Sequence, residues 1–123
     1  MNPPNFLILY VASPLTSSQF YADLLKIPPV ESSPTYAMLP LANGTLLGLW
    51  SRETVEPQVT VEPGCSEVAF TLENDAEVDR CHAEWAGKGI AIAQAPTRMD
   101  FGYTFTGLDP DGHRLRVFAP NPR

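Results

Sequence analysis

The sequence predicts an α+β fold in which one domain, residues 1–123, is built from two βαββ modules. Three observations lead to this prediction. The order strand, helix, strand, strand occurs twice, a turn sequence joins the last two strands each time, and the 13 prolines fall mostly at element boundaries. Because proline interrupts helices and central strands, this distribution is typical of a punctuated, folded chain. We expect module 1 at about residues 5–51, a linker at 52–65 and module 2 at about 66–119.

The first module begins with a strand and a helix. The apolar run FLILYVA at residues 6–12 is typical of a buried strand. Ser13 and Pro14 then predict a helix start, because serine caps helices and proline fits the first helical position. The residues expected on the apolar face of this helix are Leu15, Phe20, Leu24 and Leu25. Pro28-Pro29 ends the pattern.

A hairpin completes the first module. Residues 35–40 and 45–50 have the composition of strands, and Asn43-Gly44 between them is a strong hairpin dipeptide, because both residues tolerate positive φ. The following residues repeat Val-Glu-Pro and show neither a helical nor a strand period, which is why 52–65 is interpreted as a linker.

The second module repeats this order. A strand is expected at 66–72, followed by a helix that Asn74 caps and in which Glu77 completes a capping-box pattern. The residues expected on one face of this helix are Val78, Cys81 and Trp85, and Gly87 or Gly89 ends it. Three strands are expected after it, at 90–94, 103–108 and 114–118, the last two joined by the turn sequence Asp109-Pro110-Asp111-Gly112.

The two modules align with each other in pattern, which favours an internal duplication. The aligned pairs are Leu9 with Phe70, Val11 with Leu72, Phe20 with Cys81, Leu24 with Trp85, Gly44 with Gly112, Leu47 with Leu115, Leu49 with Val117 and Trp50 with Phe118.

Charge and composition exclude several function classes. Fourteen acidic residues against eight basic ones give a formal net charge of −6, which argues against nucleic acid or a basic membrane-binding patch. No apolar run approaches the roughly 20 residues that cross a bilayer, and the N-terminus lacks the basic start of a signal peptide. Cys65 and Cys81 form no zinc or disulfide motif. We therefore expect a cytoplasmic protein without a membrane partner.

The chain resembles a known superfamily. The Ser-Pro helix start, the helix sequence Phe20-Tyr21-x-x-Leu24-Leu25 and the late run Leu108-Asp109-Pro110-Asp111-Gly112-His113 are similar to the vicinal oxygen chelate superfamily of glyoxalase I, bleomycin-resistance proteins and extradiol dioxygenases. Within it, Leu49-Trp50-Ser51 and Glu84-Trp85 are most similar to phenazine-resistance binding proteins. The resemblance implies that the curved sheets of the two modules form a ligand cleft, in a homodimer with clefts at or near the subunit interface.

The resemblance also implies where a metal would bind. Metal-dependent members carry a ligand on the first and last strand of each module, and these positions fall on Phe6, Gly48, Glu67 and Arg116. A divalent metal needs several N, O or S donors. A benzyl ring, a missing side chain, one carboxylate and a cation do not supply them, so the sequence predicts neither a metal nor another cofactor.

What remains is an aromatic cleft with one ion pair. Large rings sandwich planar ligands by stacking, and arginine grips carboxylates. The leading hypothesis is therefore metal-independent binding and sequestration of a planar aromatic antibiotic, of phenazine or similar type, without a catalytic residue. The predicted ligand-binding residues are Phe6, Tyr10, Gly48, Trp50, Glu67, Trp85, Phe101, Tyr103, Phe105, Arg116 and Phe118.

Several alternatives stay open at this point. Trp50 and Phe118 also fit the core of a collapsed sheet, Trp85 has the periodicity of a core residue, and Glu67 and Arg116 suit an internal salt bridge. An enzyme is the rival function. It would be a metal-independent lyase or isomerase with Glu67 as base and Tyr10 as proton donor, or a metal-dependent lyase or dioxygenase if the ligand register differs.

Overall fold

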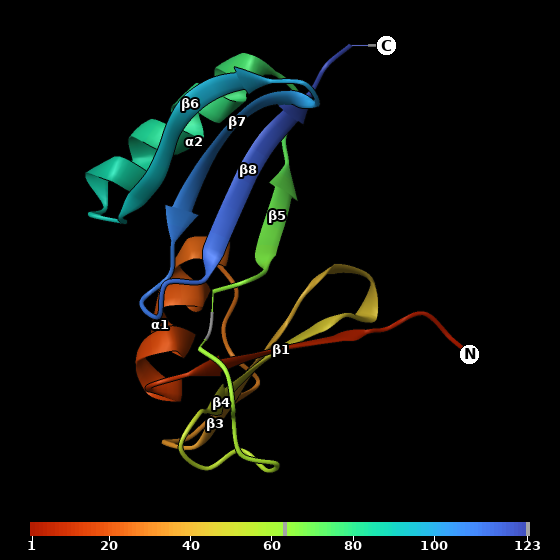
Figure 1. Ribbon diagram of the computed structural model, residues 1–123, viewed down its shortest axis with the longest axis vertical. Coiled ribbons are helices and arrows are strands. Elements are labelled where there is room, and N and C mark those ends of the chain that lie inside the picture. Colours follow the sequence, from red (N-terminus) through yellow and green to blue (C-terminus); the bar gives the residue numbers. More distant parts are fainter. Residues whose placement is uncertain (63, 123) are drawn as a thin grey trace. The chain divides into compact units, whose positions relative to one another are not determined.

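The computed structural model describes residues 1–62 and 64–122 as two compact units that divide next to Glu62 (Figure 1). Each unit is a four-stranded sheet with one α-helix. The elements of unit 1 are β1 (Phe6–Val11), α1 (Pro14–Leu25), β2 (Glu31–Ser32), β3 (Tyr36–Pro40), the short helix η1 (Ala42–Gly44) and β4 (Leu46–Ser51). Those of unit 2 are β5 (Glu67–Thr71), α2 (Asp75–Gly87), β6 (Ile92–Met99), β7 (Gly102–Leu108) and β8 (Arg114–Pro120).

Both sheets have the same topology. The strand order is β1-β4-β3-β2 in unit 1 and β5-β8-β7-β6 in unit 2. In each unit the first strand runs parallel to the last, and the remaining neighbours are antiparallel. A helix between the first strand and the hairpin makes the parallel pairing reachable, because parallel strands need a long crossover. The α+β fold of two mixed sheets predicted from the sequence is confirmed.

The helix of unit 1 starts as predicted but buries other residues. The Ser13 hydroxyl accepts a hydrogen bond from the Thr16 N–H at 3.2 Å, and Pro14 occupies the first turn. The predicted apolar face holds only in part, because Phe20, Leu24 and Leu25 are half-buried but Leu15 is 48% exposed. The fully buried residues of α1 are Pro14, Ser17, Ser18 and Tyr21.

The helix of unit 2 follows its prediction more closely. The Asn74 side chain accepts a hydrogen bond from the Glu77 N–H at 2.9 Å. The capping box is incomplete, because the Glu77 carboxylate pairs with Arg80 one turn further on. Val78 and Trp85 are buried, as their spacing indicated, and Trp85 makes edge-on contacts with the sheet.

The sixth strand is longer than predicted. It spans Ile92–Met99 in place of 90–94 and continues past Pro96. Proline cannot donate to a ladder, and two register shifts within the β6–β7 pairing, the second between Gln94 and Thr97, accommodate it at this sheet edge. A strand that crosses a proline at an edge is not visible in the local sequence pattern.

Residues of the predicted linker pack against unit 1. The Arg52 N–H donates to the Val11 carbonyl at 2.9 Å, Val55 is 4% exposed, and the Arg52 guanidinium lies 3.2 Å from the Glu62 carboxylate. The first part of the segment therefore belongs to the core of unit 1. No helix among residues 1–62 and 64–122 combines the length and the apolar character that crossing a membrane requires.

Candidate functional site

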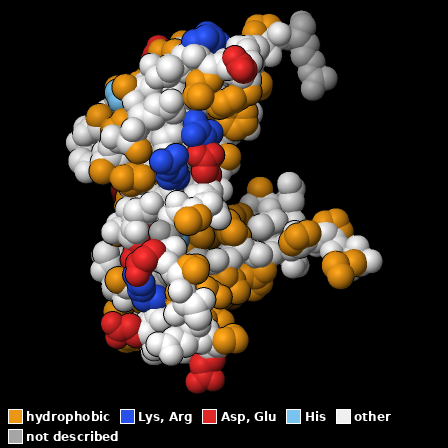
Figure 2. All heavy atoms as spheres, in the orientation of Figure 1, with side chains coloured by type: hydrophobic (Ala, Val, Ile, Leu, Met, Phe, Trp, Pro, Cys, Tyr) orange, Lys and Arg blue, Asp and Glu red, His pale blue; other side chains and the backbone are white. Residues whose placement is uncertain are grey.

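Strand alternation gives unit 1 an aromatic surface on the side of its sheet away from α1, which we call the outer face of unit 1. In β1, Leu9 and Val11 point to the buried side, whereas Phe6, Ile8 and Tyr10 expose 41%, 42% and 39% of their surface. The residues that share this face by register are Phe6, Ile8, Tyr10, Glu31, Tyr36, Met38, Pro40, Leu46, Gly48 and Trp50. Figure 2 shows hydrophobic side chains gathered in the region of β1.

The hairpin brings a further ring to this face that the sequence did not predict. Asn43 (φ 60°) and Gly44 (φ 76°) form the tight turn, and the Thr45 N–H donates to the Ala42 carbonyl at 3.2 Å. Ala42 is an extra residue in the loop, so that Tyr36 pairs with Trp50. A simple two-residue turn would pair Ala37 with Trp50 and turn Tyr36 to the helix side, because a one-residue slip exchanges the faces of a strand.

Tyr36 also changes the role of Gly48. A Cβ atom at Gly48 would lie 2.6 Å from the Tyr36 hydroxyl oxygen and 3.0 Å from the Phe6 ring. The Tyr36 and Phe6 side chains already occupy the space beside Gly48, so the missing side chain does not open that space to a ligand. A larger residue at this position would force the Tyr36 side chain to shift.

A hollow of about 340 Å³ lies on the outer face of unit 1, lined by Ile8, Glu31, Tyr36 and Trp50. The Tyr36 and Trp50 rings meet edge to face, with centroids 6.1 Å apart. Burial and then the nearby Glu31 carboxylate raise the pKa of the Tyr36 phenol, which keeps its hydroxyl protonated as a hydrogen-bond donor. The hollow thus combines two rings, an aliphatic side chain and one carboxylate, in a volume suited to a small ligand.

The equivalent surface of unit 2 has different chemistry. It lies on the side of the sheet away from α2, and we call it the outer face of unit 2. Arg116 and Glu67 form a two-pronged ion pair there, with Nε 2.9 Å from Oε1 and Nη2 2.8 Å from Oε2. The Arg116 Nη1 also donates to the Gln94 side-chain oxygen at 3.3 Å and to the Thr104 hydroxyl at 3.2 Å. The two strands pair Glu67 with Arg114 in register, so the ion pair is diagonal. Figure 2 shows acidic and basic side chains side by side on this unit.

The ion pair sets the charge state of both partners. The hydrogen bond from Arg116 is the main cause that lowers the pKa of the Glu67 carboxyl, with burial opposing it. The same bond raises the pKa of Arg116. A carboxylate held ionised in this way is a weak base, because a general base works best with a pKa near the operating pH. The geometry of Glu67 is that of a salt bridge, one of the two roles predicted for it.

Two rings complete the outer face of unit 2. Phe118 shares this face with Arg116 by register. Phe101, in the turn between β6 and β7, contacts Phe118 edge to face with centroids 5.6 Å apart. The Arg116 guanidinium lies 5.8 Å from the Phe101 ring centroid, within the range of a cation–π contact. The structure therefore brings Glu67, Phe101, Arg116 and Phe118 together.

Three predicted residues lie on the other side of the sheet of unit 2. Phe105 is fully buried and Trp85 is 6% exposed, with their ring centroids 5.2 Å apart in the core beneath α2. Tyr103 also points to the helix side, where its hydroxyl donates to the Asp79 carboxylate at 2.7 Å. The expectation that Tyr103 and Phe105 face the ligand is corrected, because β7 alternates and places Thr104 and Thr106 on the outer face instead. Trp85 takes the core position that its periodicity had offered as the alternative.

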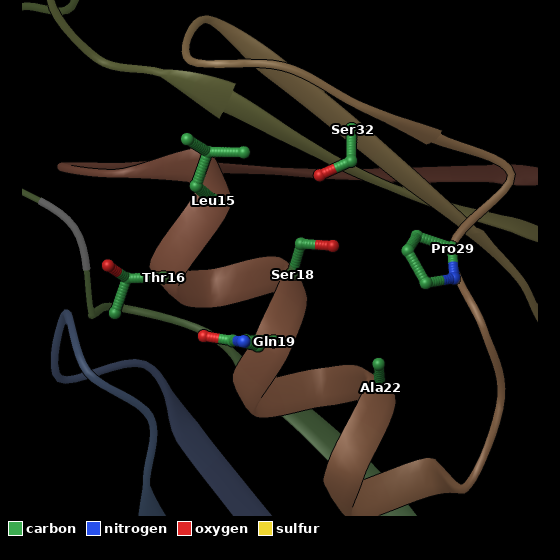
Figure 3. Close-up of a pocket in the computed structure, with 7 residues that line it drawn as sticks. All are labelled: Leu15, Thr16, Ser18, Gln19, Ala22, Pro29 and Ser32. Atoms are coloured by element: carbon green, nitrogen blue, oxygen red, sulfur yellow. The ribbon is translucent and has the colours of Figure 1, made fainter.

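Two further hollows lie away from the outer faces. One, of about 300 Å³ in unit 1, is lined by Leu15, Thr16, Ser18, Gln19, Ala22, Pro29 and Ser32 (Figure 3). It carries no titratable side chain. The other, in unit 2, is lined by Glu73, Asn74, Asp75, Ala76, Arg98, Pro120, Asn121 and Pro122. There the Arg98 guanidinium already pairs with Asp75 and Asn121.

The residues at the expected metal positions do not fit a metal. In unit 1 these positions carry Phe6 and Gly48, which offer no donor atom. In unit 2 they carry Glu67 and Arg116, and the guanidinium uses both carboxylate oxygens of its partner. Among the described residues, no three His, Cys, Asp or Glu side chains lie close enough to hold an ion together. No chemical step through a metal is derived from this donor set.

Comparisons with known proteins agree with the motifs. Residues 4–117 match the family model described as Glyoxalase/Bleomycin resistance protein/Dioxygenase superfamily. The chain is 33% identical over 117 residues to the phenazine antibiotic resistance protein EhpR of Enterobacter agglomerans, a span of 93% of this chain and 89% of the relative.

Solved structures share the fold. The solution NMR structure of protein ATC0852 from Agrobacterium tumefaciens is 56% identical, covers 99% of this chain and 100% of that one, and has a TM-score of 0.89. A crystal structure of a glyoxalase/bleomycin resistance protein/dioxygenase from Nocardioides has a TM-score of 0.80 at 24% identity, over 98% of this chain and 84% of that one. The second likeness concerns the fold alone.

Proposed function

Because the chain belongs to the Glyoxalase/Bleomycin resistance protein/Dioxygenase superfamily, we propose that it confers resistance by binding a planar aromatic small molecule of the phenazine type and withholding it from its target unaltered. The observation that carries this proposal is the outer face of unit 1. It presents the rings of Phe6, Tyr10, Tyr36 and Trp50 on one side of the sheet, and Tyr36 and Trp50 line the hollow there.

Ring chemistry supports this ligand class. Aromatic contacts add about 0.5–1.5 kcal/mol each beyond the burial of area, and a flat ligand meets several rings at once. Phe6, Ile8 and Tyr10 keep about two-fifths of their surface exposed, so a ligand on this face would bury apolar area that the fold leaves uncovered. The name of the relative EhpR links a protein of this kind to phenazine resistance.

The chemistry at Glu67 favours binding over catalysis. The carboxylate that an acid–base mechanism would use has its pKa lowered by Arg116, and both of its oxygens accept hydrogen bonds from that guanidinium. The Glu67 carboxylate already accepts hydrogen bonds from Arg116 at both oxygens, so it is poorly placed to take a proton from a ligand. The outcome of incubating ligand with protein is therefore expected to be unchanged ligand, which mass spectrometry of the mixture measures directly.

Tryptophan fluorescence tests the binding site, because the two tryptophans lie in different units. Trp85→Phe leaves Trp50 on the outer face as the sole reporter, and Trp50→Phe leaves Trp85 in the core of unit 2. Titration with phenazine should quench the Trp85→Phe variant in a saturable way and the Trp50→Phe variant far less. Free N-acetyltryptophanamide corrects for light absorbed by the ligand. Equal quenching of the two variants would contradict the proposed site.

A second measurement separates binding from resistance. Trp50→Ala should lower the affinity for phenazine by about tenfold, measured by equilibrium dialysis, because one stacking partner and its buried area are lost. Phe118→Ala in parallel tests whether the rings on the outer face of unit 2 contribute. In a susceptible bacterium, the wild-type chain should raise the tolerated phenazine concentration and Trp50→Ala should not. Resistance that persists in a variant that no longer binds would contradict sequestration.

The proposed assembly is a homodimer. β1 is an edge strand of its sheet, and Leu7 on its helix side is 38% exposed. An edge strand with an exposed apolar side chain outside the ligand surface is one that proteins usually cover. A second copy of the chain supplies that cover with two-fold symmetry. Sedimentation equilibrium should give twice the mass of the chain, and a monomer at working concentration would contradict this assembly.

A further inference from the structure

The hollow on the outer face of unit 1 contains a charge that stacking alone does not explain. Among the described strand residues that form this face, Glu31 is the one that carries a formal charge, and it lies at the rim beside Tyr36 and Trp50. Its position follows from the register, which pairs Glu31 of β2 with Met38 of β3. The exposed carboxylate is thus held beside two rings by a short edge strand.

No basic side chain of unit 1 neutralises this carboxylate. The unit has two of them, and the Arg52 guanidinium pairs with Glu62 at 3.2 Å. Lys26 lies at the C-terminal cap of α1 and forms no ion pair with Glu31 in the described part of the chain. Glu31 therefore offers an unpaired negative charge at the mouth of an aromatic hollow.

A carboxylate beside ring faces attracts a particular class of group. The face of an aromatic ring carries a negative electrostatic potential. Tyr36, Trp50 and Glu31 therefore all favour a cation and disfavour an anion. A simple apolar ligand would gain nothing from the charge. The combination is complementary to a flat aromatic body that carries a positive amino group.

We propose that Glu31 is a specificity-determining residue, and that it pairs with a positively charged, amino-substituted edge of the planar ligand while the ring system lies against Trp50 and Tyr36. This inference rests on the proposed function and narrows its ligand class to cationic, amino-substituted aromatics. The Tyr36 hydroxyl, which stays protonated, donates a hydrogen bond to a ring nitrogen or another acceptor of the same ligand.

A matched pair of probes tests the charge preference. Acridine and 9-aminoacridine share one planar ring system, and at mildly alkaline pH the first is neutral and the second a cation. Calorimetric titration of the wild-type chain should show tighter binding of the aminoacridine, and added salt should weaken that binding selectively. Glu31→Gln should lower the affinity for the aminoacridine by about tenfold and leave that for acridine within about twofold.

The control variant is Glu56→Gln, which removes one exposed carboxylate of the same unit outside the hollow and changes the net charge equally. It should bind both probes as the wild-type chain does. Equal binding of the two probes by the wild-type chain, or an equal loss in both carboxylate variants, would overturn the role of Glu31 while leaving the proposed function intact. Failure of acridine, aminoacridine and phenazine alike to bind would overturn both.

Discussion

The outer faces of the two units share one framework and carry opposite chemistry. In unit 1, the row across the sheet at the end of β1 reads Tyr36, Trp50 and Tyr10. The equivalent row of unit 2 reads Thr104, Phe118 and Thr71. In the neighbouring row, two residues earlier in the last strand of each sheet, unit 1 has Gly48 and unit 2 has Arg116. The same strand order thus supports an exposed aromatic surface in one copy and a hydrogen-bonded ion network in the other.

The difference shows that two sheets of the same topology can offer a ligand different groups. On the outer face of unit 1 the rings keep exposed area and the carboxylate of Glu31 lacks a cation, so both are available to a ligand. On the outer face of unit 2 the Arg116 guanidinium already serves Glu67, Gln94 and Thr104. We infer that ligand recognition depends mainly on unit 1.

The largest expected effect comes from copying the residue of unit 2 into unit 1. Gly48→Arg should lower the free energy of unfolding by about 3 kcal/mol, because overpacking a filled position forces neighbours out of their rotamers. Here the Tyr36 hydroxyl and the Phe6 ring stand 2.6 Å and 3.0 Å from the new Cβ. Urea unfolding followed by circular dichroism measures the change.

The control for this substitution is Gly87→Arg. Gly87 is the last residue of α2, no atom beyond its chain neighbours and the helix's own backbone lies within 4 Å of the position its Cβ would take, and a cation suits a helix C-terminus. It should unfold within about 0.5 kcal/mol of the wild-type chain. If Gly48→Arg is equally harmless, the packing of Tyr36 over Gly48 does not constrain this position.

The next largest effect is a difference in stability between variants of Arg116 and Arg114, the two arginines on the outer face of unit 2. Arg116→Met keeps the aliphatic stem but leaves Glu67, Gln94 and Thr104 without their shared donor. We expect a loss of about 2 kcal/mol in the free energy of unfolding, since part-buried acceptors of a charged donor lose their partner. Arg114→Met, two residues away on the same strand face, should cost less than about 0.5 kcal/mol because its side chain is exposed. Equal losses would contradict the network.

The sequence predicted the framework well and the chemistry of the faces only in part. Helix caps at Ser13 and Asn74 and the turn at Asn43-Gly44 depend on local residue types, and the structure has all three. The shared faces of Phe6, Gly48 and Trp50 follow from strand alternation and were predicted as well. These features need no knowledge of distant contacts.

What the sequence did not reveal depends on register and close packing. The extra residue Ala42 in the hairpin decides which face Tyr36 takes, and no propensity indicates it. Glu31 reaches the hollow through a two-residue strand that has no periodic pattern. Tyr103 and Phe105 alternate with Thr104, so one residue of register in β7 decides between core and outer face.

The smallest expected effect is the pH dependence of the Glu67–Arg116 pair. The pKa of the Glu67 carboxyl is lowered from its ordinary value of 4.5, so the pair adds stability above that pH and loses it as the pH falls through the lowered pKa. Because the Glu67 side chain is 34% exposed, we expect no more than about 1 kcal/mol. The difference in unfolding free energy between the wild-type chain and Glu67→Gln should therefore be constant near neutral pH and shrink below about pH 4.5.

Urea titrations at a series of pH values measure this difference, and the Arg116→Met background is its control. Without the guanidinium, the main cause of the lowered pKa is gone, and Glu67→Gln should change the unfolding free energy by a similar amount across the whole pH series. A pH dependence that survives in that background would assign the effect to Arg114, the other cation near Glu67, and would mean that the network of unit 2 extends along β8.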